Sequence, residues 1–148
     1  MNGRLSTILA IWTFKRKRFL DGRLLKHKAR LCSHLGVQKW GISYWDNYAP
    51  VVNWISVQTL LAITKIHNLR SRSIDFVLEF PQSDLDVNVY MDLPNGIDAP
   101  YGGKRDYVLK LKKSLYGLKQ ASENWFETLK AGLNSISFEQ SQVDPCVF

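Results

Sequence analysis

Acidic and basic side chains are segregated along this chain in a way that could bind metal ions and polyanions. Residues 73–103 contain no Lys or Arg and six carboxylates, which are Asp75, Glu79, Asp84, Asp86, Asp92 and Asp98. Residues 1–40 carry ten Lys or Arg against one acid, a net charge of +9, and residues 104–119 carry a net +5. Clustered carboxylates suit a divalent cation, and basic surfaces suit a polyanion. Solvated faces without a ligand would give the same pattern, so charge alone leaves both interpretations open.

Length and composition indicate one globular domain, or part of a larger one. The 148 residues are 45% hydrophobic and 22% charged with a net charge of +7, which excludes a disordered chain. No apolar run approaches the roughly 18 residues needed to cross a bilayer. The first basic cluster follows the first apolar stretch, the reverse of a secretory signal. Cys32 and Cys146 form no disulfide framework, so we expect a reducing, intracellular compartment (cytoplasm or nucleus) and no secretion.

Residues 8–33 are predicted to form a β-hairpin. Apolar residues alternate from Ile8 to Phe14, and Asp21-Gly22 supplies the residues of a tight turn. Along the returning arm, Leu25–Leu31, apolar residues alternate with basic ones. We therefore expect one packed face and one strongly basic face, which would serve as a clamp for phosphates or simply as a soluble edge.

The rest of the pattern predicts an α+β domain rather than alternating βαβ units. Apolar spacing near 3.6 predicts helices over 55–67, with Asn53 or Ser56 as the N-cap, and over 121–136. Short strands are expected over 73–77, 87–91 and 107–112, and the start of another over 143–148.

The stretch Tyr107–Trp125, YVLKLKKSLYGLKQASENW, is the most distinctive in the chain. It resembles the LKKSLYGLKQAxxxW motif of reverse transcriptases from copia-type LTR retrotransposons. Other blocks similar to that family follow in the family's order. They are WTFKRKR (12–18), KHKARL (26–31), YAPVV (48–52), TLLA (59–62), the segment 75–91 with VYM at its end, and DPCVF (144–148). The resemblance covers residues 11–148.

This resemblance implies a partial right-hand polymerase. The expected fold is α+β, a partial fingers and palm of a reverse transcriptase, with an N-terminal β-hairpin and a palm sheet packed on helices. A fingers-like hairpin and helix would occupy about 8–70, and a palm-like region with fingers elements, incomplete at its C-terminal end, would occupy about 71–148. The integrase upstream, and the rest of the palm, the thumb and the RNase H downstream, would be absent.

The implied reaction is RNA-directed DNA polymerisation, in which a primer 3′-hydroxyl attacks the α-phosphate of a dNTP at two Mg²⁺ ions. By the family's first catalytic block, Asp75 would be catalytic and a metal ligand, and the backbone carbonyl of Phe76 would be a further ligand. Phe80 stands where the family has the aromatic ring that excludes a ribose 2′-hydroxyl and so selects dNTPs.

The basic hairpin and the LYGLKQ block supply the remaining expected contacts. Lys28 and Arg30 are candidates for gripping the dNTP triphosphate, and the sequence does not choose between them. The resemblance adds four dNTP-side residues, which are Tyr116, Gly117, Lys119 and Gln120. A further cluster is expected to meet template phosphates, or merely solvent, and consists of Lys15, Arg16, Lys17 and Arg18.

Five aromatic residues between 40 and 54 could stack on bases. They are Trp40, Tyr44, Trp45, Tyr48 and Trp54. In the resembled family this region packs under the palm, so a place in the core is favoured for them.

The chain departs from the family pattern in two ways. The family's first block commonly reads DVxxAFLNGxL, whereas here Glu79 replaces the alanine and Pro81-Gln82-Ser83 replaces Leu-Asn-Gly. A carboxylate at this place could repel phosphates or misplace a metal. The family's Tyr-x-Asp-Asp hairpin is also missing, since no Asp-Asp pair occurs in the 148 residues. With only Asp75 supplied, the two-metal site cannot form, so we expect a truncated or decayed fragment that is inactive alone.

Two alternatives stay open at this point. A non-catalytic basic nucleic-acid-binding module would suit the net +9 of residues 1–40, and an ordinary α+β interaction domain would use its basic faces only for solubility. The expected partners of the parent enzyme are an RNA/DNA primer–template and dNTPs, not a membrane. A Tyr-x-Asp-Asp encoded just beyond codon 148 would favour the polymerase, whereas a stop codon there would indicate a remnant.

Overall fold

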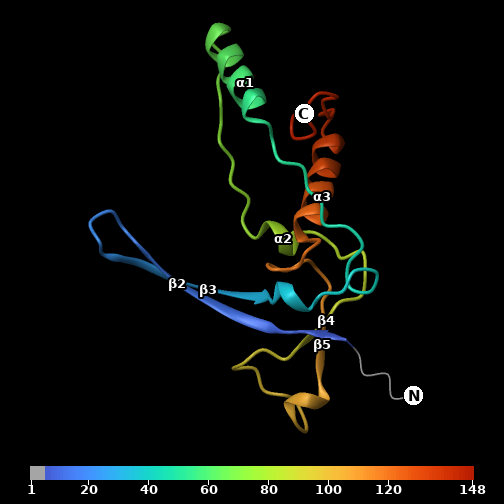
Figure 1. Cartoon of the computed structure of the whole chain (residues 1–148). Helices are drawn as coiled ribbons and strands as arrows, with labels where there is room; N and C mark the ends of the chain where they lie inside the picture. The colour runs from blue at the N-terminus through green and yellow to red at the C-terminus, as the bar shows by residue number, and fades with distance from the viewer. Residues whose placement is uncertain (1–5) are drawn as a thin grey trace.

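A long antiparallel β-hairpin forms the N-terminal part of the computed structural model, which describes residues 6–148 (Figure 1). Strand β2 (Ala10–Arg18) pairs with β3 (Leu24–Ser33) in a register that runs from Ala10↔Ser33 to Lys17↔Lys26. At the tip, the Asp21 carboxylate accepts the N–H of Arg23, and Gly22 takes a φ of +85°. The predicted hairpin is thus confirmed, with its turn at the predicted Asp-Gly pair.

A second, three-stranded sheet lies beside the base of the hairpin. Its order is β1 (Thr7–Ile8), β4 (Tyr90–Asp92) and β5 (Val108–Lys110). Strand β1 runs parallel to β4, and β4 runs antiparallel to β5. The strands predicted over 87–91 and 107–112 are confirmed as β4 and β5, although both are shorter than expected.

Three α-helices complete the described fold of residues 6–148. They are α1 (Trp54–Ile66), the single turn α2 (Glu79–Gln82) and α3 (Ala121–Ser135), with short 3₁₀ turns η1 (Leu35–Val37) and η2 (Lys104–Asp106). Asn53 caps α1 by accepting the N–H of Ile55 at 3.0 Å, so the first of its two predicted caps is the one used. None of the helices within this range is long and apolar enough to cross a membrane.

The buried core is small and joins the three-stranded sheet to the start of α3. Its fully buried apolar side chains belong to Ile8, Val89, Met91, Leu118 and Ala121. The hairpin reaches this core only through its base, where Ala10 and Leu31 pack against it. The indole of Trp12 also donates to the carbonyl of Asn95 at 2.9 Å, which ties the base of β2 to the loop after β4.

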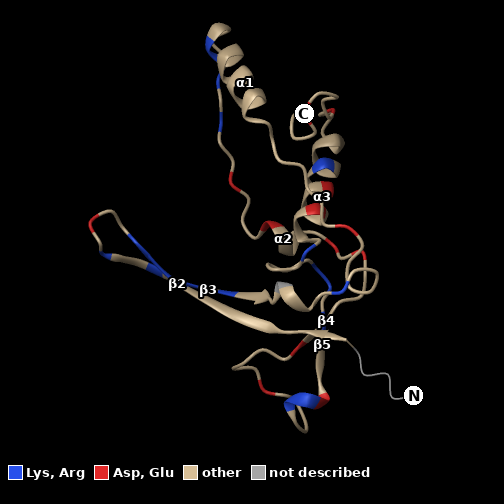
Figure 2. Cartoon of the chain, viewed as in Figure 1, with Lys and Arg blue, Asp and Glu red and all other residues tan. Residues whose placement is uncertain are grey.

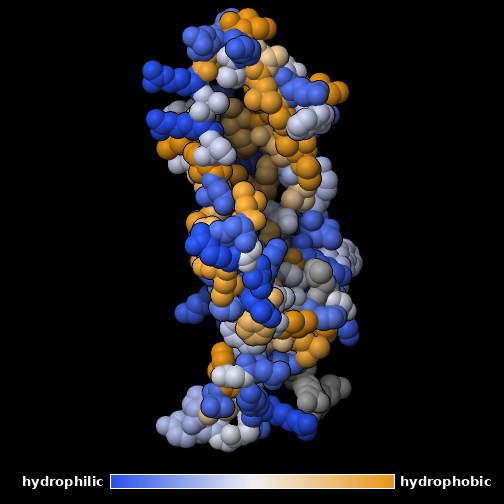
Figure 3. Space-filling view, turned by 90° about the vertical axis from the view of Figure 1, so that its left-hand side faces the viewer, coloured by the Kyte–Doolittle hydropathy of each residue, from blue (hydrophilic) through white to orange (hydrophobic). Residues whose placement is uncertain are grey.

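Helix α1 stands away from this core. None of its residues is buried, and the Trp54, Ile55 and Ile66 side chains are each more than half exposed. Figure 1 shows α1 carried on two extended segments, and apolar side chains gather in the corresponding upper half of the space-filling view (Figure 3). Its N-terminus is held to the turn after α3, where the Asn53 N–H donates to the Asp144 carboxylate at 2.9 Å.

Two predicted strands do not form. Residues 73–76 are extended without a ladder, and 77–78 make a turn, so the strand expected over 73–77 is wrong. Residues 143–148 form a turn closed by the Val147 N–H to the Asp144 carbonyl, so the strand expected there is also wrong. A strand needs a partner to satisfy its backbone, and neither segment has one within residues 6–148.

Two burial predictions are also wrong. The apolar face of the hairpin is packed only at its base, since Phe14 is 77% exposed. The aromatic residues expected in the core are mostly at the surface, with Trp40 69% and Tyr48 72% exposed. Trp40 and Trp45 instead pack edge-to-face on each other at 5.9 Å between ring centroids, so the local pair replaces the expected core.

Candidate functional site

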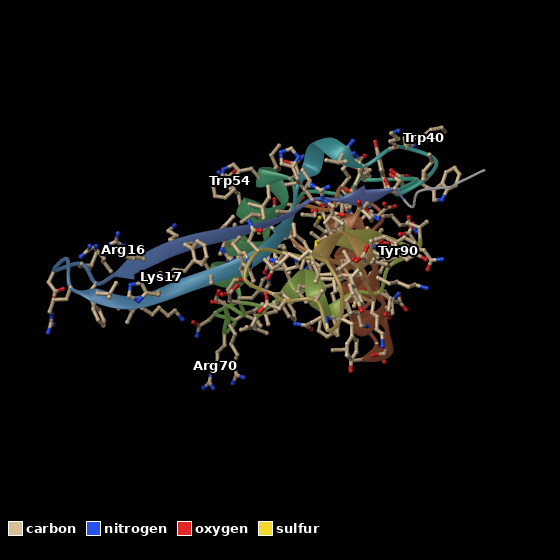
Figure 4. All side chains as sticks on the ribbon, turned by 90° about the horizontal axis from the view of Figure 1, so that it is seen from below. Arg16, Lys17, Trp40, Trp54, Arg70 and Tyr90 are labelled. Carbon is tan, nitrogen blue, oxygen red and sulfur yellow. The ribbon has the colours of Figure 1, made fainter. Side chains whose placement is uncertain are left out.

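One face of the hairpin carries a run of cations. The register sets Lys15 opposite Lys28, Lys17 opposite Lys26, and Thr13 opposite Arg30 on the same face. Because side chains alternate along a strand, Trp12, Phe14 and Arg16 fall on the other face. Figure 2 shows the basic residues concentrated toward the free end, and Figure 4 shows Arg16 and Lys17 there, away from the rest of the chain. The predicted division into a basic and an apolar face is thus confirmed.

These cations are poorly neutralised within the described chain. Over residues 6–148, the hairpin has one ion pair, between Arg23 and Asp21 at its tip. Burial lowers the pKa of Lys28, and the charges of Arg30, Lys17 and Lys26 lower it further. Like charges directly opposite each other destabilise a hairpin. The basic face therefore favours an anion placed against it.

The basic face ends in a half-buried pocket where three separate stretches of sequence meet. The Arg30 guanidinium lies 5.2 Å from the centroid of the Tyr116 ring, and the Phe80 ring packs edge-to-face on Tyr116 at 5.0 Å. Stacking on an aromatic ring holds a guanidinium in place while leaving its N–H groups free to donate. The Nε of Arg30 is buried and finds no acceptor within residues 6–148. We call Lys28, Arg30, Phe80 and Tyr116 the hairpin-base pocket.

Glu79 is the one carboxylate that acts on this pocket. It precedes Phe80 at the start of α2, and the Tyr116 hydroxyl donates to its carboxylate. Burial raises the pKa of Tyr116, and the hydrogen bond and charge of Glu79 raise it further, whereas Arg30 lowers it. The negative charge of Glu79 also partly offsets the lowering of the Lys28 pKa. The pocket therefore combines two cations with an internal anion.

A tight turn fixes Tyr116 against the hairpin. The Ser33 N–H at the end of β3 donates to the Tyr116 carbonyl at 2.7 Å. Gly117 follows with a φ of +88°, and a Cβ at this position would collide with the Ser33 carbonyl oxygen. Glycine is required here both by backbone conformation and by space, which is a positioning role for Gly117.

Lys119 and Gln120 face away from this pocket and form a polar network with the segment after η1. Gln120 is 1% exposed, and its amide accepts from Gln38 Nε2 at 2.9 Å and donates to the Ser43 carbonyl at 3.0 Å. The Lys119 ammonium donates to the Tyr44 hydroxyl at 3.1 Å. Sequence analysis gave no role to Gln38 or Ser43, and no local motif marks them, because their partners lie about 80 residues away.

Asp75 lies outside the hairpin-base pocket, on the extended segment that leads from α1 to α2. Its side chain is exposed, while the next residue, Phe76, packs edge-to-face on Trp125 of α3 at 5.1 Å between ring centroids. Within residues 6–148, no three Asp, Glu, His or Cys side chains come close enough to hold a metal ion. This geometry fixes the backbone beside Asp75 but gives its carboxylate no acidic neighbours.

Comparison with known proteins decides the family. Residues 4–148 match the family model described as reverse transcriptase (RNA-dependent DNA polymerase). This chain belongs to the reverse transcriptase family. The membership predicted from the LYGLKQ block and the blocks around it is therefore confirmed.

The curated relatives of this reverse transcriptase chain are Pol polyproteins of copia-type transposons. The retrovirus-related Pol polyprotein from transposon TNT 1-94 of Nicotiana tabacum is 36% identical over 137 residues, covering 93% of this chain and 10% of that protein. The one from transposon RE1 of Arabidopsis thaliana is 35% identical, covering 93% and 9%. The Ty1-ER2 Gag-Pol polyprotein of Saccharomyces cerevisiae is 31% identical, covering 95% and 8%.

The chain thus spans about a tenth of the length of the curated relatives it matches. No solved structure matches it. As a reverse transcriptase domain segment it has mixed α and β content, as predicted, with three α-helices and two small sheets in residues 6–148.

The family's use of Mg²⁺ can be tested against the donors of this reverse transcriptase segment. Mg²⁺ prefers hard oxygen ligands and is usually bound by one or two carboxylates together with substrate phosphates. The exposed Asp75 carboxylate and the Phe76 carbonyl are the predicted donors, and no carboxylate cluster surrounds them in residues 6–148. The described residues therefore do not make a two-metal site by themselves.

Proposed function

We propose that this chain is the part of a retrotransposon reverse transcriptase that holds nucleic acid and nucleotide phosphates. In this proposal residues 8–70 are fingers-like and residues 71–148 are palm-like, and the parent enzyme is an RNA-directed DNA polymerase that uses dNTPs and Mg²⁺. The family assignment supports this, since the relatives are named as Pol polyproteins. The whole enzyme's reaction is part of the proposal, because the chain spans about a tenth of those relatives.

The observation that carries the proposal is the hairpin-base pocket. Arg30 comes from the KARL block, Phe80 from the first catalytic block and Tyr116 from the LYGLKQ block, yet ring stacking unites all three. The buried Arg30 Nε lacks an acceptor within residues 6–148, and a buried donor without one is costly. A phosphate oxygen would satisfy it, because guanidinium and phosphate geometries match.

The rest of the hairpin extends this pocket into a track for a nucleic-acid strand. Lys15 and Lys17 continue the basic face outward from Lys28, and Arg16 and Arg18 lie beside them near the tip. Phosphates are separated along a strand by distances that a hairpin of this length can follow. We propose that this track meets template phosphates while the hairpin base faces the nucleotide.

The other predicted site residues have different parts in the proposal. Gly117 positions Tyr116, and Lys119 and Gln120 hold the LYGLKQ block in place through Tyr44, Ser43 and Gln38. Asp75 is proposed as a carboxylate ligand to Mg²⁺ with the Phe76 carbonyl, in a site that needs further carboxylates. The 148 residues contain no Asp-Asp pair. We therefore expect no Mg²⁺-dependent dNTP incorporation from this chain alone, and measurable primer extension would contradict that expectation.

The binding test is a salt titration of a fluorescent RNA/DNA primer–template with the 148-residue chain. Replacing Lys28 and Arg30 by Ala should weaken binding and reduce the slope of log Kobs against log salt by about 1.4 to 1.8, since two phosphate contacts are lost. The matched control replaces Lys104 and Arg105, two basic residues at the far end of the molecule from the hairpin (Figure 2). Equal effects of the two double variants would contradict the proposal.

A non-catalytic nucleic-acid-binding module is the second candidate. It is favoured by the basic face, which is complete within the described residues and needs no metal. Binding to a primer–template junction and to a blunt duplex of equal length separates the two functions. A polymerase segment should prefer the junction, whereas a general binding module should bind both equally.

A further inference from the structure

Glu79 gives the hairpin-base pocket an unusual balance of charge. Two cations, Lys28 and Arg30, face a carboxylate that accepts from Tyr116, so an anion entering the pocket meets attraction and repulsion together. In residues 6–148 neither cation makes an ion pair with an acid, so the carboxylate moderates the field without cancelling it.

The fold keeps Glu79 at this place. Leu78, the residue before it, has a left-handed φ of 56°, which turns the extended segment 67–78 into α2. Phe80, the residue after it, is seated on the Tyr116 ring. With both neighbours constrained, the Glu79 backbone cannot move away from an incoming ligand without breaking the ring contact. Its carboxylate is therefore a fixed part of the pocket.

A fixed carboxylate affects different phosphate ligands unequally. Coulomb repulsion grows in proportion to ligand charge, and it is stronger in a half-buried pocket than in bulk water. A phosphodiester in a nucleic-acid strand brings one negative charge, whereas a free triphosphate brings several into the same space. Two cations and one anion balance the first ligand and leave the second under-compensated.

We propose that Glu79 is a specificity-determining residue that matches this pocket to a single phosphodiester of a nucleic-acid strand and against a nucleotide triphosphate. The inference rests on the proposed function, since it assumes that Lys28 and Arg30 bind phosphate. It assigns to one side chain the choice between two ligands of the same pocket.

The experiment measures the affinity of the 148-residue chain for inorganic tripolyphosphate and for a short single-stranded oligonucleotide. Variants Glu79→Gln and Glu79→Ala remove the charge with and without preserving shape, and Asp98→Ala removes an exposed charge elsewhere. Thermal unfolding of each variant checks that it is folded. Glu79→Gln should tighten tripolyphosphate binding about tenfold and oligonucleotide binding by no more than about threefold, while Asp98→Ala should change both alike and by little.

The outcomes separate this inference from the proposed function. Selective tightening for tripolyphosphate supports the inference. Equal changes for both ligands, or none, would overturn it while leaving phosphate binding intact, provided that Lys28→Ala with Arg30→Ala still abolishes binding. If wild type and Glu79→Gln bind neither ligand, or if the Lys28/Arg30 variant binds as tightly as wild type, both the inference and the proposed function fail.

Discussion

Gly117 illustrates how a single residue positions the hairpin-base pocket. Its φ of +88° lets the LYGLKQ turn reach the end of β3, where the Tyr116 carbonyl accepts from Ser33. The same turn brings the Tyr116 ring under Arg30. A side chain at this position would separate the turn from the hairpin, so both folding and the proposed binding site depend on the missing Cβ.

Gly117→Ala should therefore lower the free energy of unfolding by about 2 kcal/mol or more, because left-handed strain and a steric collision add together. Urea denaturation measures this loss. Gly96→Ala is a matched control, since Gly96 has a similar φ of +85° but open space around it. The control should lose only about 1 kcal/mol from strain. Equal losses in the two variants would show that the contact with Ser33 is not tight.

Residue-level prediction succeeded where chemistry was marked by local sequence. The sequence placed Arg30, Phe80 and Tyr116 in three recognisable blocks, and the structure brings their side chains together. It gave no sign that Gln120 would be fully engaged inside the protein, because the partner amide of Gln38 is 82 residues away. Contacts of this kind depend on tertiary packing, which neither periodicity nor a motif encodes.

At the scale of elements, local signals predicted the hairpin and both long helices. Alternation and Asp21-Gly22 specify the hairpin, and 3.6-residue spacing with Asn53 as N-cap specifies α1. The same reasoning failed for 73–77, since β-propensity in that segment cannot form a strand without a partner strand. Helices satisfy their own backbone groups and so follow from sequence more directly than strands do.

The connection between α1 and the C-terminal turn depends on one carboxylate. Hydrogen bonds from the Ser56 hydroxyl, and then from the N–H groups of Cys146 and Asn53, lower the pKa of Asp144 below its usual 3.8, while burial opposes the shift. A carboxylate at a helix N-terminus also interacts favourably with the helix dipole. Asp144 thereby joins two elements that share no apolar core.

Acid should weaken this connection. Because the pKa of Asp144 is lower in the folded chain than in the unfolded one, its stabilising effect is complete above about pH 4 and is lost as pH falls through the lowered folded value. The urea midpoint of Asp144→Asn should lie below that of wild type at pH 6, and the two should converge toward pH 2. Asp98→Asn, at an exposed site, is the control. A wild-type advantage that persists unchanged at low pH would argue against this link.

Across the whole molecule, burial is concentrated in a small region. The five buried apolar residues join β1, β4 and the start of α3, while α1 has none and the outer hairpin is solvated. Local stability follows buried contacts, so it should vary strongly from one part of the chain to another. The sequence could not predict this contrast, because α1 is as apolar as a core helix.

Hydrogen exchange should reveal this contrast directly. Backbone amides in the middle of α1, residues 58–66, should exchange at least about tenfold faster than those of Ser33 and Leu118, a difference of about 1.4 kcal/mol or more in opening free energy. Amides in the first turns of α3, beside buried Ala121, serve as a helical control. If α1 and α3 are protected equally, α1 is covered in solution by a contact that the isolated chain makes.

The long-range bonds of the LYGLKQ block have a consequence for synthesis on the ribosome. The Gln38–Gln120 hydrogen bond spans 82 residues, and the Ser33–Tyr116 bond spans almost as many. At roughly 5–20 residues per second, the hairpin therefore exists for several seconds before its anchor has been translated. During that interval a strongly cationic nascent segment is free to meet any nearby RNA, including the message being read, before residue 120 fixes it in place.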